Sequence, residues 1–461
     1  MQIPIISGIY TDTAGDFRTS YPVNLVPIPK SQGISEGYLR PADGIVPTGT
    51  GPGICRGSIV WSGVLYAVMG TSLVAISAGG ALTTIGAIPG YTRVSLDYGF
   101  NHLAIAADND LYLYDGTTLA KNTDPDLGTV LDVVWVDGYF MTTDGSALVV
   151  TELNDPFAVN PLKYGSSEVN PDPIVGVVKV RNEIYAVNRN TIEVFDNIGG
   201  SGFPFSRING AQIHKGAVSA HMAREYGGGI AFVGGGVSEP PSVWFGANGT
   251  ATKLATAEID TILEGYGEDD LAKSWITVRS DRVSEILYIH LPDKTLAYDA
   301  SASTAMGSAV WYILNSGSGW RVASFAWFNG EWIVFDTDTA QIGKFTKSIS
   351  SHWGSVVDWE FSSLIIYSGQ RGMLHSLELV ALPGRVALGD NPVISTQYTV
   401  DGMTWSTPRS ISAGVVGSIT KRLIWLQQGP ISNWRAQRFN GRSTAHLSVA
   451  RLEAQIEGMA F

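Results

Sequence analysis

Seven pairs of apolar, β-branched and aromatic segments recur along the chain, and a tight turn joins the two segments of each pair. The pairs begin at residues 59, 94, 132, 176, 218, 276 and 323, at intervals of 35 to 58 residues. A period of roughly 40–45 residues that carries strand pairs is typical of β-propeller blades. The repeat predicts an all-β fold with a propeller of six or seven blades over residues 57–349. A stack of β-sandwiches, which also has closely spaced strands, is the less favoured alternative.

Two of the turns contain the dipeptides that type I′ hairpins require. Asp137-Gly138 and Asn329-Gly330 each separate two strand-like segments. Both central residues of such a turn have positive φ, which Asn, Asp and Gly adopt most easily. We therefore expect tight hairpins at these two positions.

The opening segment, residues 1–56, differs from the repeat in its proline content. It holds Pro4, Pro22, Pro27, Pro29, Pro41, Pro47 and Pro52 of the chain's 21 prolines. Proline lacks a backbone N–H and is confined to sheet edges and bulges, so we expect an extended arm rather than a sheet centre. Apolar residues in the arm indicate that it packs on its own body or on a neighbouring subunit.

Two other segments also depart from the repeat. Ile259, Ile262 and Leu263 recur at helical spacing and predict a helical insertion at about residues 254–273. Beyond about residue 350, several segments alternate apolar and polar side chains, which suits a sheet with one solvated face. We therefore expect a C-terminal β-sandwich over residues 350–461.

Charge and composition exclude several classes of protein. The formal net charge of −12 makes the chain a poor candidate for a general nucleic-acid binder, which neutralises phosphates with Lys and Arg. An apolar fraction of 44% excludes a disordered chain. The sequence has neither an apolar run long enough for a membrane helix nor the pattern of a signal peptide.

The motifs of common catalytic and cofactor sites are missing from the sequence. The seven histidines are scattered, and there is no H-E-x-x-H, G-x-S-x-G or P-loop pattern, so we expect no catalytic, cofactor or metal site. Asp108 with Asp110, and Asp336 with Asp338, offer oxygen ligands for Ca²⁺, but turn carboxylates that accept backbone N–H groups are commoner. Convergent carboxylates with exposed Trp244, Trp320 or Trp353 would instead suit a carbohydrate-binding or glycan-hydrolysing propeller, the alternative function.

Several sequence blocks resemble a known family. Tyr21–Lys30 and Gly37–Ile45 resemble the start of the packaged-DNA stabilisation proteins, the tail-hub (tail accessory) proteins of short-tailed bacteriophages that infect enteric bacteria. Three later blocks follow in the family's order: Ile213–Gly216, the run from Thr256 through Ser301, and Trp311–Gly317. The resemblance covers roughly residues 20–320, and the C-terminal third matches in general character.

The resemblance implies a structural virion protein, made in the host bacterial cytoplasm and carried in the phage tail. It would form a homo-oligomer, a hexamer in the family, on the portal–adaptor ring. The ring would retain packaged DNA, pass it through the lumen without tight binding, and hold the tail needle or plug and the tailspikes. Within the arm, Tyr38, Leu39 and Arg40 are our candidates for a contact with a neighbouring subunit or the adaptor. Packing of these residues against the first blade is the alternative.

Overall fold

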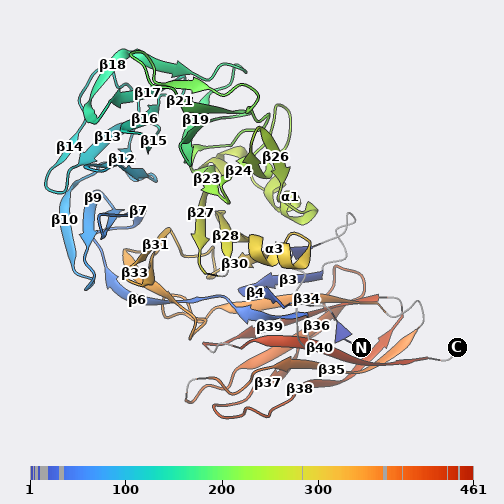
Figure 1. Cartoon of the computed structure of the whole chain (residues 1–461). Helices are drawn as coiled ribbons and strands as arrows, with labels where there is room; N and C mark the ends of the chain where they lie inside the picture. Colours follow the sequence, from blue (N-terminus) through green and yellow to red (C-terminus); the bar gives the residue numbers. More distant parts are fainter. Residues whose placement is uncertain are drawn as a thin grey trace.

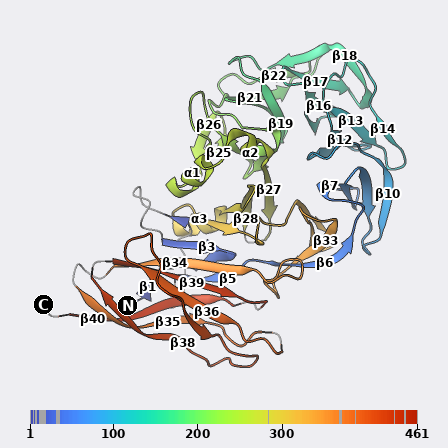
Figure 2. The same ribbon diagram turned by 180° about the vertical axis from the view of Figure 1, so that it is seen from behind.

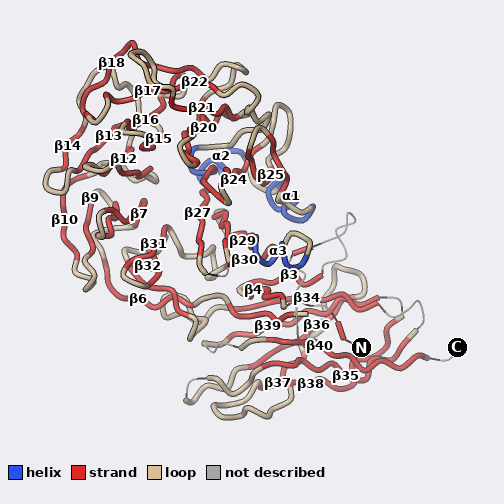
Figure 3. The backbone as a smooth tube through the Cα atoms, viewed as in Figure 1, coloured by secondary structure: helices blue, strands red, loops and turns tan. Residues whose placement is uncertain are grey.

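The computed structural model describes residues 2–3, 5, 9–10, 19–30, 36–282, 284–366, 371–386, 388–432, 434–444 and 447–459. Strands dominate this part of the chain, and they form two bodies (Figures 1 and 3). A ring of small sheets, coloured blue to yellow in Figure 1, lies beside a two-layered body in orange and red. Figure 2 shows the same arrangement from behind.

Within the described residues, the ring consists of seven four-stranded antiparallel blades, each beginning with its innermost strand. This arrangement confirms the predicted propeller and fixes the blade number at seven. Blades 1 to 3 contain β7 (Cys55–Trp61), β8 (Val64–Met69), β9 (Ser72–Ile76), β10 (Leu82–Ala87), β11 (Ser95–Tyr98), β12 (Leu103–Ala107), β13 (Asp110–Tyr114), β14 (Leu119–Lys121), β15 (Asp132–Val136), β16 (Tyr139–Thr143), β17 (Ala147–Glu152) and β18 (Asp155–Ser166). Blades 4 to 6 contain β19 (Ile174–Val180), β20 (Glu183–Asn188), β21 (Ile192–Asn197), β22 (Phe205–Arg207), β23 (Ala223–Tyr226), β24 (Gly229–Gly234), β25 (Ser242–Ala247), β26 (Thr250–Lys253), β27 (Trp275–Ser280), β28 (Glu285–His290), β29 (Thr295–Asp299) and β30 (Trp311–Leu314).

Blade 7 takes its strands from both ends of the propeller sequence. It consists of β31 (Ser324–Phe328), β32 (Glu331–Phe335), β33 (Gln341–Thr346) and the N-terminal strand β6 (Gly44–Thr50). Pairing of the outermost strand β6 with β33 closes the ring. The predicted hairpin turns are also present, with positive φ at Asp137 (48°), Gly138 (91°), Asn329 (50°) and Gly330 (80°).

The N-terminal segment is extended, as expected, but it is built into sheets of both bodies. β3 (Thr19–Val23) lies between β30 of blade 6 and β34 (Asp358–Ile366) of the sandwich, and β2 (Ile9–Tyr10) pairs with β3. The expectation that proline keeps this segment out of a sheet centre is therefore wrong for β3, which contains Pro22. The register of β3 against β34 is irregular between Ser20 and Val23, and a sheet tolerates proline at such a place.

The sandwich combines C-terminal strands with strands of the N-terminal segment. One sheet has the order β38-β35-β40-β5-β4, with β1 also paired to β40. The other contains β34, β39, β36 and β37, and it continues through β3 into blade 6. The strands are β1 (Gln2–Ile3), β4 (Leu25–Pro29), β5 (Gly37–Pro41), β34 (Asp358–Ile366), β35 (Gly372–Ala381), β36 (Val393–Thr399), β37 (Arg409–Ser412), β38 (Leu423–Ile431), β39 (Trp434–Arg442) and β40 (Val449–Gly458). Side chains from both sheets, including those of Leu25 and Leu39, form the sandwich core.

The helices lie beside blades 5 and 6 (Figure 3). α1 (Ala257–Glu264) and α2 (Glu268–Lys273) form the predicted helical insertion, and Ile259 and Leu263 are fully buried. The sequence analysis missed α3 (Ala300–Met306), which Asp299 caps and which ends at Gly307, with φ of 68°. A short 3₁₀ helix covers Ala220–Met222. None of the described helices has the length and apolar character needed to cross a membrane.

Candidate functional site

A cleft of about 1220 Å³ opens between blades 6 and 7, beside strands β4 and β5. The inner strands of the other neighbouring blades approach one another closely around the ring, whereas β27 and β31 do not. Side chains from these two blades and from the N-terminal strands therefore line an open space. The cleft lies where the propeller meets the sandwich.

An ion-pair network crosses one wall of the cleft. The Asp43 carboxylate lies 2.6 Å from Arg40 Nη1 and 3.0 Å from Arg279 Nη1, and the side chains of Asp43 and Arg279 are each 8% exposed. Burial favours the neutral form of Asp43, but the two guanidinium groups outweigh burial and hold its pKa below the usual value. The network joins the N-terminal segment to blade 6.

Aromatic rings make the floor of the cleft rigid. Trp320 stacks on His290 at 5.6 Å and on Phe345 at 5.9 Å, with interplanar angles of 11° and 14°. The Arg279 guanidinium lies 4.9 Å from the centre of the Phe345 ring. Burial raises the pKa of Tyr288 to about 12, so this phenol is neutral over the physiological range.

The rim of the cleft is more exposed and carries further aromatic and cationic side chains. Trp327 is 55% exposed, and its ring lies 5.5 Å from that of Trp332, its partner across the β31–β32 hairpin. Arg282 and Lys347 also line the cleft and are exposed. Within the described residues, neither cation forms a salt bridge.

The structure places the three predicted contact residues on two faces of β5. Alternation along a strand puts Tyr38 and Arg40 on one face, where both line the cleft. Leu39 points the other way and is fully buried in the sandwich core. Contact with a neighbouring subunit or the adaptor stays a prediction, and Tyr38 and Arg40 offer accessible atoms for it.

The other residues considered from sequence have identifiable structural roles. Asp336 is fully buried and pairs with Arg321, while Asp108 and Asn109 form a hairpin turn with φ of 53° and 66°. Among the described residues, no group of three or more His, Cys, Asp or Glu side chains is placed to hold a metal ion. Trp320 and Trp353 are buried in the core.

Sequence reasoning missed the cleft and its exposed tryptophan. The available signal was the pair Trp327 and Trp332, which flank the Asn329-Gly330 turn in register. Hairpin geometry places such a pair on one face of the blade. Whether that face is covered depends on the neighbouring blade, which the local sequence does not specify.

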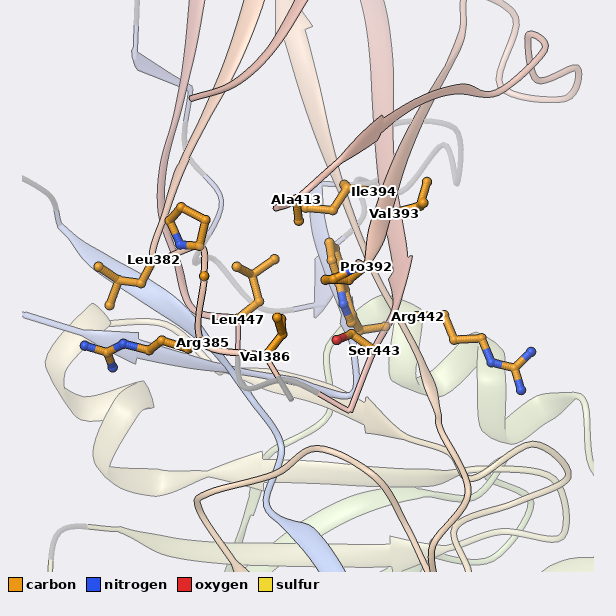
Figure 4. A pocket seen from close by; sticks show the side chains of 13 residues that line it. Leu382, Arg385, Val386, Pro392, Val393, Ile394, Ala413, Arg442, Ser443 and Leu447 are labelled. Carbon is orange, nitrogen blue, oxygen red and sulfur yellow. The ribbon is translucent and has the colours of Figure 1, made fainter. Parts of the chain in front are cut away.

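A second pocket lies at one end of the sandwich, between the loops that follow β35 and β37 (Figure 4). Its apolar lining includes Leu382, Pro392, Ile394 and Leu447. Its cavity volume of about 10 Å³ is roughly the space that one water molecule occupies. This pocket is therefore a packing defect between the two sheets and has no room for a ligand.

The solved structures that are similar to this chain give TM-scores below 0.5. PorZ of Porphyromonas gingivalis has a TM-score of 0.41 and 10% identity, with coverage of 79% of this chain and 46% of PorZ. The N-terminal domain of Nup159 has a TM-score of 0.39 and 8% identity, with coverage of 65% of this chain and 90% of that domain. Scores this low carry no argument about function.

Sequence relatives are more informative. The tail hub protein gp10 of Salmonella phage P22 is 27% identical over 461 aligned positions, which cover 93% of this chain and 94% of that protein. The family described as "Bacteriophage P22 Gp10, beta-propeller" matches residues 1–350, and "Bacteriophage P22 Gp10, beta-sandwich" matches residues 358–457. The chain therefore belongs to the bacteriophage P22 Gp10 family of tail hub proteins.

Proposed function

We propose that this chain is the ring-forming subunit of a phage tail hub, which retains packaged DNA and anchors the needle and tailspikes. As a member of its family, the chain is a structural protein of the phage tail. The proposal goes further: a hexameric ring would assemble on the portal–adaptor ring, and DNA would pass through its lumen without tight binding. Its action would be mechanical, with no catalytic step.

The observation that carries this proposal is the extent of the family match. Both domains match in order, and the alignment to the P22 tail hub protein spans nearly the full length of both chains. A net charge of −12 on each subunit disfavours tight binding to the DNA backbone. Each of these observations suits a conduit built from many copies.

Exposed apolar side chains on the outer edge of blade 3 support assembly. Leu162 and Tyr164 on β18 are 81% and 61% exposed and lie close together in sequence. Clustered apolar surface of this kind commonly marks a protein interface. We infer that the edge of blade 3 takes part in a contact between subunits or with another tail protein.

Light scattering on the purified protein, alone and mixed with its portal–adaptor complex, tests the proposal. We expect a monomer alone and a defined ring on the complex. The double variant Leu162→Glu/Tyr164→Glu should stay monomeric in the mixture. Thr83→Glu, on the exposed outer strand of blade 1, should assemble normally. A wild-type protein that remains monomeric in both conditions would contradict the proposal, and a glycan-hydrolysis assay would then test the alternative.

A further inference from the structure

We propose that the hairpin turns along one face of blades 2 to 4 dock a basic polypeptide segment of another protein. In each blade, the turn between the first two strands and the turn between the last two lie at the same edge, because the four strands are antiparallel neighbours. We call this surface the turn face. Its turns cover residues 99–102, 115–118, 137–138, 153–154, 181–182 and 198–204.

The turn face is separate from the sandwich. Blades 2 to 4 lie on the side of the ring that is away from the two-layered body (Figures 1 and 2). The inference rests on the chemistry of this face and not on the proposed ring. A hub protein that failed to form a ring would leave it intact.

Apolar side chains protrude from these turns and from the strand ends beside them. The exposed members are Tyr98, Phe100, Leu153, Phe157 and Ile198. The Phe100 ring packs edge-on against Trp135 of blade 3 at 5.3 Å, so the patch crosses from one blade to the next. Asn197 Nδ2 donates to Asp137 Oδ2 at 2.9 Å, which joins blade 3 to blade 4 directly before Ile198. Contiguous apolar surface of this kind marks protein interaction sites.

The turn that carries Phe100 is fixed by its neighbours. The Gly99 N–H donates to the His102 carbonyl oxygen at 2.9 Å, and Trp61 Nε1 donates to the Gly99 carbonyl oxygen at 3.2 Å. A Cβ on Gly99 would lie 2.6 Å from Trp135 Nε1, so glycine permits this close approach. The fold itself therefore holds Phe100 outward, with 84% of the residue exposed, and binding would require little ordering of the protein.

The charge of the turn face favours a cationic occupant. Seven carboxylates lie in the turns or within two residues of them, and three of these have cationic neighbours. Glu152 pairs with Lys163 at 2.6 Å, and Glu183 pairs with Arg181 at 3.1 Å. Asp97 interacts with Lys179 and with Arg224 of blade 5.

The other four carboxylates are exposed and form no salt bridge within the described residues. They are Asp115, Asp137, Asp155 and Asp196. Hydrogen bonds from N–H groups hold them in place but leave their charge. The seven carboxylates and the four cations together give the turn face a net charge of −3.

A basic segment matches both the charge and the aromatic surface. Its Lys or Arg side chains would pair with the exposed carboxylates and lie over the free face of Phe100. Trp135 already accepts a cation in this way, with Lys179 Nζ 5.1 Å from its ring centre. The turn face of a second copy would bring like charges together, and DNA or an anionic membrane would be repelled.

Fluorescence anisotropy with the full-length protein tests this inference. The probe is a labelled synthetic peptide, Gly-Lys-Arg-Leu-Arg-Phe-Lys-Gly. Two comparison peptides replace either its four basic residues with glutamate or its leucine and phenylalanine with alanine. We expect the probe to bind at least about tenfold more tightly than either comparison peptide, and its affinity to fall as salt is raised. Absence of binding at millimolar peptide, or equal binding of the alanine peptide, would overturn the inference.

An aromatic variant and its control locate the binding site. Phe100→Ala should weaken binding of the probe about fivefold or more. Tyr91→Ala removes another ring, 87% exposed, from the connection between blades 1 and 2 at the opposite edge of the propeller. This control should change affinity less than twofold. Equal losses would mean that the probe does not use the turn face and would refute the inference.

A charge variant and its control separate a local site from general attraction to an acidic protein. Asp137→Asn combined with Asp196→Asn should weaken binding about fivefold. Asp108→Asn combined with Asp126→Asn removes the same charge from exposed turns at the opposite edge. Asp137 and Asp108 have φ of 48° and 53°, which asparagine also adopts, so both pairs of substitutions keep the backbone. The control should change affinity less than twofold, and an equal loss in both double variants would refute the inference.

Discussion

Asn24 offers the sharpest test of how the propeller and sandwich are joined. Its side-chain Nδ2 donates to the backbone oxygens of Asn315 and Asp358, each at 2.7 Å, and its Oδ1 accepts the Asn315 N–H at 2.9 Å. The Asn24 side chain, directly before β4, therefore connects the N-terminal segment to the end of β30 in blade 6 and to the start of β34 in the sandwich. Asn24 itself is 4% exposed and has φ of 54°.

Replacing Asn24 with alanine has two separable effects. It removes three hydrogen bonds, each worth about 0.5–1.5 kcal/mol, so their loss should cost about 1.5–4.5 kcal/mol of unfolding free energy. It also places alanine in the left-handed region, at a cost of roughly 1–2 kcal/mol. Asn248→Ala is the matched control, because Asn248 is exposed and has φ of 50°. The control should show the backbone effect alone.

Urea denaturation followed by tryptophan fluorescence and by circular dichroism measures the two effects. We expect Asn24→Ala to lower the unfolding free energy by about 1.5–4.5 kcal/mol more than Asn248→Ala does. Asn24→Asp should be at least as damaging, since a carboxylate would face two carbonyl oxygens without a proton to donate. If Asn24→Ala and Asn248→Ala differed by less than about 0.5 kcal/mol, the hydrogen bonds would not hold this junction, and the reasoning would fail.

Three further predictions concern packing, pH and the shared sheet. Gly234→Ala would drive a Cβ into the backbone oxygen of Gly216, far inside van der Waals contact, and should cost about 1–3 kcal/mol. Gly202→Ala meets open space and should be nearly neutral in the same urea assay. Burial lowers the pKa of His352 to about 4 and that of His290 well below its usual value. The folded protein keeps both histidines neutral, whereas the unfolded chain protonates them below about pH 6.5. Their contribution to the free energy of unfolding should therefore be complete above about pH 6.5 and should fall as the pH is lowered toward about 4. His352→Gln should reduce that slope by about 1.4 kcal/mol per pH unit, measured by urea titration at several pH values. Residues 358–459 expressed alone should lack a cooperative thermal transition, because β4 and β5 are missing from the sandwich sheet. A peptide that contains those two strands should restore the transition. A cooperative transition without the peptide would contradict this prediction.

Local sequence signals predicted the parts of the fold that local physics determines. The Asp137-Gly138 turn follows from backbone preferences, and the helix around Ile259 follows from its apolar spacing. The strand repeat likewise predicts blades, because each hairpin is formed by residues close in sequence. These elements need little information from the rest of the chain.

Other features depend on residues far apart in sequence, which no local pattern reveals. β6 pairs with β33 across almost the whole propeller, and the Thr48 hydroxyl donates to the Ile342 carbonyl oxygen at 3.2 Å. The role of Asn24 depends on β30 and β34, which are equally remote in sequence. The cleft arises because blades 6 and 7 diverge, and the sequence of either blade alone does not encode that divergence.

The N-terminal segment makes the two bodies one mechanical unit. β6 closes blade 7, β3 lies between a propeller strand and a sandwich strand, and β4 and β5 complete a sandwich sheet. A rotation of the sandwich relative to the propeller would have to break these backbone hydrogen bonds together with the Asp43–Arg279 ion pair. Hydrogen bonds loaded together resist displacement far better than a flexible linker, which offers only conformational entropy. Force applied to the sandwich would therefore reach blades 6 and 7 directly.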